Sequence, residues 1–123
     1  MTPITVLLVD DDPDMRLYLR SCLRSPSLQV ERVIEAGDGV EALRLARTEG
    51  VHVVISDILV PGLDGRALCR AIRELPDLNE TVLLLISGED GAGPAEHDAD
   101  GFLPKPFNSR QLVAALQDLL PEA

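Results

Sequence analysis

Several polar residues in this sequence follow aliphatic runs and could together carry out phosphoryl chemistry. Three carboxylates, one hydroxyl and one amine stand at such positions: Asp10, Asp11, Asp57, Ser87 and Lys105. Three carboxylates held in one pocket repel one another strongly unless a cation lies between them. An oxygen-rich anionic pocket suits Mg²⁺, which takes one or two carboxylates, keeps several waters and accepts phosphate oxygens. A carboxylate beside such a cation can attack phosphorus and form an acyl phosphate.

The hydroxyl and the amine would complete such a site, because the charge on the transferring phosphoryl oxygens must be stabilised. We expect Lys105 to supply a point charge and Ser87 to supply a hydrogen bond to the arriving phosphoryl group. Ser87 could instead be only a turn residue at a strand end, and Lys105 only a solvated surface lysine. The position of both at strand ends, in register with the acids, favours the functional interpretation.

The elements that would position these residues follow the pattern of a βα repeat. Aliphatic runs of strand length alternate with stretches of helical periodicity, and Gly, Pro, Asp or Asn marks each changeover. The predicted strands span residues 5–9, 31–35, 51–56, 81–86 and 101–103. Ligands of an open doubly wound sheet sit outside the carboxyl ends of its strands, so the polar residues above should meet at one edge of the sheet.

The helices are predicted from their caps and from the spacing of their apolar residues. Asp12 should cap a helix that ends near residue 24. The buried face of that helix should consist of Met15, Tyr18, Leu19, Cys22 and Leu23. Asp38, Asp64 and Asn108 should cap three further helices. In the glycine-rich stretch before the last strand, at most a short helix is expected over about 94–99.

Charge and hydropathy exclude several classes of function. The chain has 11 Lys and Arg against 21 Asp and Glu, and its formal net charge of −10 would repel nucleic-acid phosphates and anionic lipid. We therefore expect no direct binding to nucleic acid and none to a membrane. No apolar run reaches the roughly 20 residues of a membrane span, and the N-terminus lacks the pattern of a signal peptide. These features predict a cytoplasmic protein.

Size and residue counts predict one compact domain over residues 1–123, because 123 residues can bury a sufficient core without disulfides or a structural metal. The two cysteines, Cys22 and Cys69, form no CxxC pair, so we expect both to be reduced residues on helix faces. The two histidines, His52 and His97, have no partner at ligand spacing and are expected at the surface.

Four segments of the chain resemble the signature segments of one family. VLLVDDDPDMR, VVISDILVPGLDG, LLLISGED and GFLPKPF are similar, in this order, to those of the CheY-like receiver domain of two-component response regulators. The resemblance spreads over nearly the whole chain. It implies an α/β fold, a flavodoxin-like doubly wound parallel sheet of five strands in order 2-1-3-4-5, with helices on both faces. In this chain the family's fourth helix, which would span about 94–99, is expected to be short or irregular.

The resemblance also implies a role for each acidic residue. Asp57 would be the phosphoacceptor, and Asp10 and Asp11 would form the acidic pair of the family. Asp11, the Asp57 carboxylate and the backbone carbonyl of Leu59 would hold Mg²⁺, with Asp10 acting mainly through water. Such a domain catalyses only its own phosphorylation and dephosphorylation, so it is not expected to be an enzyme in the usual sense.

The switch and the partners follow from the same resemblance. Ser87 would move toward the phosphoryl oxygens, and Phe102 would turn inward behind it. The Lys105–Pro106 bond resembles the cis peptide of the family, which would aim the lysine into the pocket. The phosphoryl donor would be a sensor histidine kinase or a histidine phosphotransfer protein, and the output an unidentified downstream protein or domain.

Two alternative functions stay open from the sequence. The first is a binding module with a receiver fold that exchanges partners without phosphorylation, which the glycine-rich fourth helix encourages. The second is a phosphatase of the haloacid-dehalogenase type, suggested by Asp10-x-Asp12 after the first strand. Pro13 and the short chain argue against the second alternative, because that family follows the DxD pair with Thr or Val and carries a cap domain.

Overall fold

The computed structural model describes residues 3–88 and 98–120, and within them the chain forms a five-stranded sheet with helices on both faces. The strands are β1 (Ile4–Val9), β2 (Val30–Ala36), β3 (Val53–Asp57), β4 (Val82–Ser87) and β5 (Gly101–Pro104). The helices are α1 (Pro13–Cys22), α2 (Gly39–Glu49), α3 (Gly65–Arg73) and α4 (Ser109–Leu119), with a 3₁₀ helix, η1, at Pro76–Leu78. All neighbouring strands are parallel, and their order is β2-β1-β3-β4-β5. The predicted fold class and strand order are confirmed.

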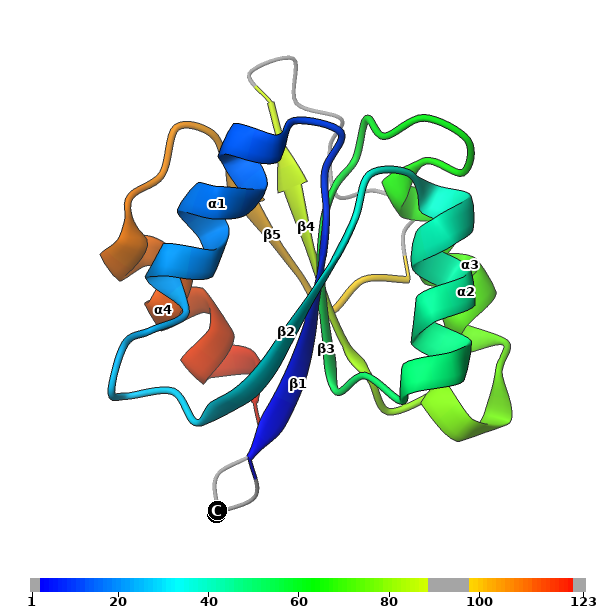
Figure 1. Ribbon diagram of the computed structural model, residues 1–123, viewed down its shortest axis with the longest axis horizontal. Coiled ribbons are helices and arrows are strands. Elements are labelled where there is room, and N and C mark those ends of the chain that lie inside the picture. Colours follow the sequence, from blue (N-terminus) through cyan, green and yellow to red (C-terminus); the bar gives the residue numbers. More distant parts are fainter. Residues whose placement is uncertain (1–2, 89–97, 121–123) are drawn as a thin grey trace.

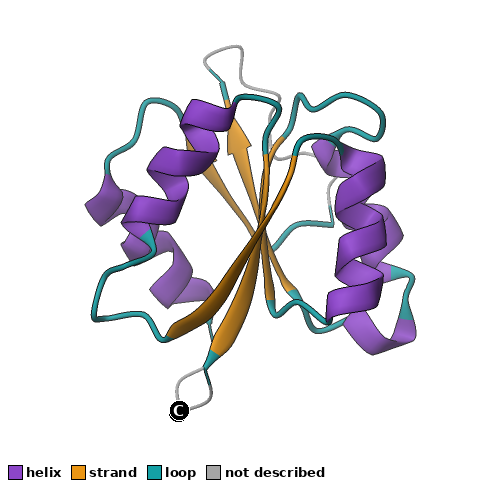
Figure 2. Ribbon diagram, viewed as in Figure 1, coloured by secondary structure: helices purple, strands orange, loops and turns teal. Residues whose placement is uncertain are grey.

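Each face of the sheet carries its own apolar core. Helices α1 and α4 lie on one side of the sheet and α2 and α3 on the other, so the strands form the middle layer (Figures 1 and 2). Along β1, Leu7 packs on the α2 and α3 side, whereas Val6 and Leu8 pack on the α1 and α4 side. All three are fully buried. A strand covered on both faces has no polar side, which explains the unbroken aliphatic runs in the sequence.

The predicted helix caps are present at all four positions. The side chains of Asp12, Asp38 and Asp64 accept hydrogen bonds from backbone amides in the first turns of α1, α2 and α3. Asn108 and Gln111 form a complete capping box at the start of α4. These caps fix where each helix begins, and therefore how the preceding loop leaves its strand.

The structure corrects the prediction for the first helix. Tyr18 is 39% exposed instead of buried, and its ring lies 6.0 Å from that of Phe107, centroid to centroid. Because α1 faces the sheet with only a narrow stripe that includes Leu19 and Cys22, the tyrosine lies at the edge of that stripe. The helix ends at Cys22, within two residues of the predicted end near residue 24. Leu23 is buried although it follows the helix.

The predicted short helix over 94–99 lies largely outside the described residues. The two described residues of that range, Asp98 and Ala99, have no helical structure. The strands begin or end within two residues of the predicted limits.

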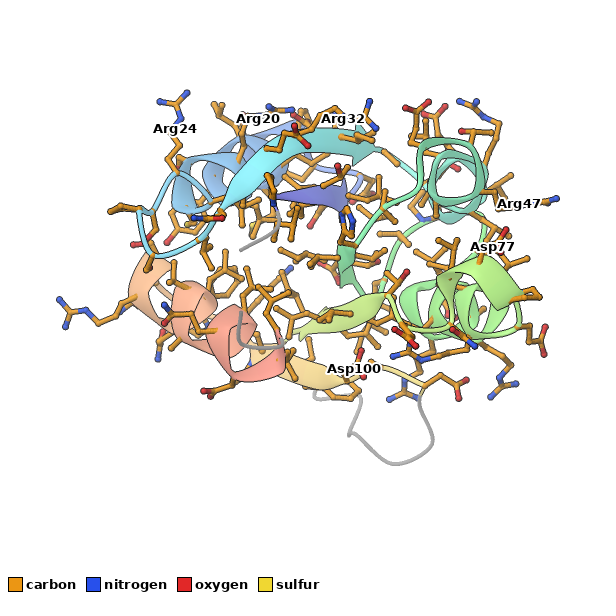
Figure 3. The ribbon with its side chains drawn as sticks, turned by 90° about the horizontal axis from the view of Figure 1, so that it is seen from below. Arg20, Arg24, Arg32, Arg47, Asp77 and Asp100 are labelled. Carbon is orange, nitrogen blue, oxygen red and sulfur yellow. The ribbon has the colours of Figure 1, made fainter. Side chains whose placement is uncertain are left out.

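Arg73, at the end of α3, ties this helix to the chain that enters β5. Its guanidinium donates hydrogen bonds to the carbonyl oxygens of Thr81 at 2.7 Å and Asp98 at 3.1 Å. Its Nη2 atom also lies 2.6 Å from Asp100 Oδ2, which accepts a second hydrogen bond, from the amide of Leu83, at 2.7 Å. Figure 3 shows Asp100 at the β5 edge of the sheet. This cluster therefore joins α3, the start of β4 and the start of β5.

His52 is exposed as predicted, but it has a structural partner within the sheet. Its Nδ1 accepts a hydrogen bond from the backbone amide of Thr5 at 3.0 Å. Its own amide donates to the Thr5 carbonyl at 2.9 Å. The imidazole thus satisfies a backbone donor of β1 just before β3 begins.

Candidate functional site

Three of the predicted site residues lie together at the carboxyl ends of the strands, which are at the top of Figure 1. Asp10 follows β1, Asp57 ends β3, and Lys105 follows β5. The register of the sheet places Asp57 beside Ile86, one residue before Ser87. The convergence follows from the topology, because parallel strands present the same end to the same edge of the sheet.

Asp57 and Lys105 form the central contact of the site. Lys105 Nζ lies 2.6 Å from Asp57 Oδ2, although the two residues are 48 positions apart in the sequence. The other carboxylate oxygen, Oδ1, accepts a hydrogen bond from the backbone amide of Leu59 at 3.0 Å. The Asp57 side chain is 12% exposed and that of Lys105 is 31% exposed. A largely enclosed carboxylate is thus paired with a cation that still reaches solvent.

The position of Lys105 is set by the backbone on either side of it. Its amide donates to the carbonyl of Ser87 at 2.8 Å, which continues the pairing of β4 and β5. The peptide bond from Lys105 to Pro106 is cis, as predicted. Burial lowers the pKa of Lys105, but its hydrogen bond to Asp57 and the charges of Asp57 and Asp10 outweigh burial and raise that pKa. The lysine is therefore a stable cation in this site.

Asp10 is the most deeply buried acid of the site, with an exposed fraction of 3%. Its Oδ1 accepts a hydrogen bond from the amide of Asp12 at 2.9 Å, which forms an Asx turn at the end of β1. Its Oδ2 is buried and has no hydrogen-bond partner. Burial raises the pKa of Asp10, and the charges of Asp57 and Asp11 act in the same direction. A buried, unpartnered carboxylate oxygen is costly, and a bound cation or its water would satisfy it.

The two other residues predicted to bind the metal ion, Asp11 and Leu59, are more exposed than Asp10 and Asp57. Asp11 is exposed, and the Leu59 side chain is 79% exposed. In residues 3–88 and 98–120, no group of three or more His, Cys, Asp or Glu side chains is arranged to hold a metal ion. The structure thus brings Asp10, Asp57 and Lys105 together, and the metal-binding roles of Asp11 and Leu59 stay predictions. The Asp57 carboxylate is paired with the lysine.

Ser87 and Phe102 lie on neighbouring strands beside this site. Ser87 ends β4 and is 8% exposed, so its hydroxyl is enclosed at the edge of the sheet that carries the acids. Phe102 lies on β5, is partly buried, and packs against the core on the α2 and α3 side. The switch role of both residues stays a prediction.

Sequence reasoning missed the close packing of Gly65 against the site. Its amide donates to the carbonyl of Ile58 at 2.8 Å. A Cβ atom at position 65 would lie 2.7 Å from the Asp57 carbonyl oxygen and 2.8 Å from Ile58 Cα. Both neighbours are backbone atoms, so only glycine lets α3 begin this close to Asp57. The available signal was Gly65 itself, the last residue of the second of the four family-like segments.

Sequence reasoning also missed two residues beside Asp10. The guanidinium of Arg16, on α1, donates to the backbone carbonyl of Asp10 and to Glu35 on β2. Burial works against ionisation of Glu35, but hydrogen bonds from Arg20 and Arg16 and the charges of both arginines lower its pKa overall. Glu35 is therefore ionised, and its carboxylate holds the Arg16 guanidinium in place. Arg16 ends the first of the four family-like segments, which was the available signal.

Within residues 3–88 and 98–120, no helix is both long enough and apolar enough to cross a bilayer.

Comparison with known proteins gives matches in sequence and in fold over almost the whole chain. A family model described as the response regulator receiver domain matches residues 6–117. Response regulator MprA of Mycobacterium sp. (strain KMS) is 35% identical over 122 residues, which cover 96% of this chain and 51% of that protein. The chain thus spans about half the length of the curated relatives that it matches.

Solved structures agree with the family model. The chemotaxis response regulator CheY4 of Vibrio cholerae superposes with a TM-score of 0.83 at 30% identity, over 97% of this chain and 100% of that one. The receiver domain of sensor histidine kinase PA1611 from Pseudomonas aeruginosa gives a TM-score of 0.82 at 26% identity, over 96% and 98%. In that structure a magnesium ion is coordinated in the active site cleft. These matches favour the receiver interpretation over a haloacid-dehalogenase phosphatase.

Proposed function

Because this chain belongs to the response regulator receiver domain family, we propose that it is a two-component signalling switch that accepts a phosphoryl group on Asp57. The proposed donor is the phosphohistidine of a sensor histidine kinase or of a histidine phosphotransfer protein. The observation that carries the proposal is the 2.6 Å contact between Asp57 and Lys105, formed next to the buried Asp10. Together these residues offer a nucleophile, a cation and a second carboxylate at one edge of the sheet.

The proposed reaction is the transfer of a phosphoryl group between two side chains. A carboxylate oxygen of Asp57 attacks the phosphorus, the bond from phosphorus to the donor histidine nitrogen breaks, and an acyl phosphate forms. The negative charge then lies on the phosphoryl oxygens, and the Lys105 ammonium stabilises it there. The Ser87 hydroxyl donates a hydrogen bond to one of the same oxygens. The chain would thus catalyse only its own phosphorylation and dephosphorylation.

We propose Mg²⁺ as the cofactor, held by the carboxylates of Asp11 and Asp57 and the carbonyl of Leu59, with Asp10 acting through water. The residues present fit this ion in their chemistry, because Asp10 Oδ2 is buried without a partner and the charges of Asp57 and Asp11 act on the same carboxylate and raise its pKa. When bound, the ion supplies positive charge that offsets the repulsion between the acids and the incoming phosphate. The magnesium ion in the related PA1611 receiver supports this assignment.

The proposed output is a change in conformation that an unidentified downstream protein or domain reads. Ser87 would move toward the phosphoryl oxygens and Phe102 would turn inward, so one covalent charge biases a two-state element. We propose that this happens in the cytoplasm, without direct contact to nucleic acid or membrane, in keeping with the net charge of −10.

The test is labelling by acetyl phosphate in the presence of Mg²⁺, followed by intact-protein mass spectrometry. Wild type should gain one phosphoryl group, and Asp57→Asn should gain none. Asp64→Asn is the matched control, because Asp64 is a nearby exposed acid that only caps α3, and asparagine caps equally well. Labelling of Asp57→Asn at the wild-type rate would refute the assignment of the acceptor.

A second measurement separates the proposal from a receiver fold that signals without phosphorylation. Beryllofluoride with Mg²⁺ imitates the phosphorylated state, so it should shift the amide resonances of Asp57 and Ser87. If wild type shows neither labelling nor these shifts, the phosphorylation-independent binding module becomes the better interpretation.

A further inference from the structure

We propose that Arg16 is a positioning residue for the cation site, because it holds the end of β1 in the conformation that leaves the buried Oδ2 of Asp10 without a hydrogen-bond partner. The inference rests on the proposed function, since it concerns the Mg²⁺ site of that function. It assigns to Arg16, which lies on α1 and not at a strand end, a share in the affinity for the cation.

The contact is made to the backbone of the buried acid. Arg16 Nη1 donates a hydrogen bond to the carbonyl oxygen of Asp10. On the other side of the same residue, the Asp10 amide donates to the carbonyl of Ala36 on β2 at 3.2 Å. The peptide groups before and after Asp10 are thus held from two directions, one by the sheet and one by the guanidinium.

The two carboxylate oxygens of Asp10 have different surroundings. Its Oδ1 closes the Asx turn by accepting from the Asp12 amide at 2.9 Å, and its Oδ2 is left buried and unpartnered. A rotation of the backbone at Asp10 would move both oxygens. The Arg16 contact opposes that rotation, so it preserves the orientation in which Oδ2 is available to the hydrated cation.

Arg16 is itself held in place by Glu35. Its Nε lies 2.9 Å from Glu35 Oε1, and the Arg16 side chain is only 19% exposed. The planar guanidinium reaches two acceptors at once, the carboxylate on β2 and the carbonyl after β1, which a lysine ammonium on a flexible stem does less well. The arginine, on α1, therefore connects the end of β1 with β2 at the edge of the sheet that carries the site.

The charge of Arg16 does not decide the direction of the effect. A lone cation near the acids would weaken Mg²⁺ binding by repulsion, and its removal would then strengthen binding. Glu35 offsets only part of this charge, because it lies 2.9 Å from Arg16 and 2.8 Å from Arg20. Replacing either arginine by methionine removes one positive charge beside Glu35, so the loss of positioning distinguishes the two changes. We expect that loss to weaken the binding of Mg²⁺ when Arg16 is removed.

Arg20 offers a matched control on the same helix. Its Nε donates to Glu35 Oε2 at 2.9 Å, and its Nη2 lies 2.8 Å from the same oxygen. Its further hydrogen bond goes to the carbonyl of Val33 at 3.3 Å, and not to Asp10. Figure 3 shows Arg20 at the β2 edge of the sheet. The two arginines thus share an ion-pair partner and differ in their contact with Asp10.

The experiment compares Arg16→Met and Arg20→Met with wild type. Mg²⁺ alone is titrated into each protein, the Kd is obtained from amide chemical shifts, and urea unfolding without Mg²⁺ reports stability separately. We expect the Kd to rise about tenfold for Arg16→Met, as for other residues that orient a metal ligand, and less than about twofold for Arg20→Met. In labelling by acetyl phosphate, Arg16→Met should need more Mg²⁺ for half-maximal rate, with a maximal rate close to wild type.

Equal Kd values for the two variants would overturn the inference, because the contact that only Arg16 makes would then have no effect on the cation. If Arg16→Met does not fold, Arg16→Lys takes its place, since it keeps a cation beside Glu35. An unchanged Kd in Arg16→Lys would equally overturn the inference, and a raised Kd would support it. Absence of Mg²⁺ binding in wild type would instead refute the proposed function, so the two failures are distinguishable.

Discussion

Replacement of Asp10 by asparagine should stabilise the fold at neutral pH when no divalent cation is present. In wild type, Asp10 is 3% exposed and its Oδ2 has no hydrogen-bond partner. A buried acceptor without a partner costs about 1–3 kcal/mol, and more when it is charged. Asparagine keeps the oxygen that accepts from the Asp12 amide and places an uncharged NH2 group at the position of Oδ2, so it removes the part of the cost that is due to the charge. We therefore expect the free energy of unfolding to rise by roughly 1–3 kcal/mol.

The pH dependence gives this prediction a definite sign. Burial, followed by the charges of Asp57 and Asp11, raises the pKa of Asp10 in the folded state above its ordinary value of 3.8. Below that ordinary value Asp10 is protonated in both the folded and the unfolded state, so its ionisation costs no stability. As the pH rises through the raised pKa, the folded state of wild type loses stability relative to the unfolded state. The advantage of Asp10→Asn should be largest at neutral pH and shrink as the pH falls.

The assay is urea unfolding in EDTA at several pH values, repeated with Mg²⁺. Asp11→Asn is the control, because it removes the adjacent but exposed charge and should change stability by less than about 0.5 kcal/mol. Mg²⁺ should stabilise wild type by mass action and have much less effect on Asp10→Asn. If Asp10→Asn is no more stable than wild type at neutral pH in EDTA, the reasoning about the unpartnered oxygen is wrong.

Two further predictions concern the residues on either side of Asp57. Lys105→Met should lower the rate of labelling by acetyl phosphate about 100-fold, because it removes the cation 2.6 Å from the carboxylate, while the Mg²⁺ Kd measured by amide shifts should not rise. A labelling rate within twofold of wild type would contradict the role given to Lys105. Gly65→Ala should destabilise the fold by about 1–3 kcal/mol in urea unfolding, because its Cβ would lie 2.7 Å from the Asp57 carbonyl oxygen. Gly88→Ala, where a Cβ meets nothing within 4 Å, is the control, and equal stabilities of the two variants would refute the packing argument.

The convergence of the site could be predicted from the sequence because it depends only on topology. Once the aliphatic runs are recognised as parallel strands, the residues after them must share one edge of the sheet, whatever their separation along the chain. Asp57 and Lys105 are 48 positions apart and still form an ion pair. The helix caps could be predicted as well, because a cap depends on only a few consecutive residues.

Contacts that depend on side-chain rotamers or close backbone approach could not be predicted in this way. The reach of Arg16 to the Asp10 carbonyl requires α1 to lie at one particular height above β2, where Glu35 receives the same guanidinium. The packing of Gly65 on Asp57 is a distance of a few ångströms between backbones, and periodicity contains no such information. Tyr18 fits the helical spacing of buried residues, yet the width of the buried stripe is decided by the neighbouring helix.

The cluster around Arg73 also helps to fix the position of Lys105. The carbonyl of Ser87, at the end of β4, accepts a hydrogen bond from the Lys105 amide. The Asp100 carboxylate, just before β5, accepts hydrogen bonds from Arg73 and from the Leu83 amide. Lys105 therefore keeps its place beside the acids through contacts that begin as far away as α3 and the first residues of β4. The chemistry at the strand ends depends in this way on an arginine at the end of α3, outside the site itself.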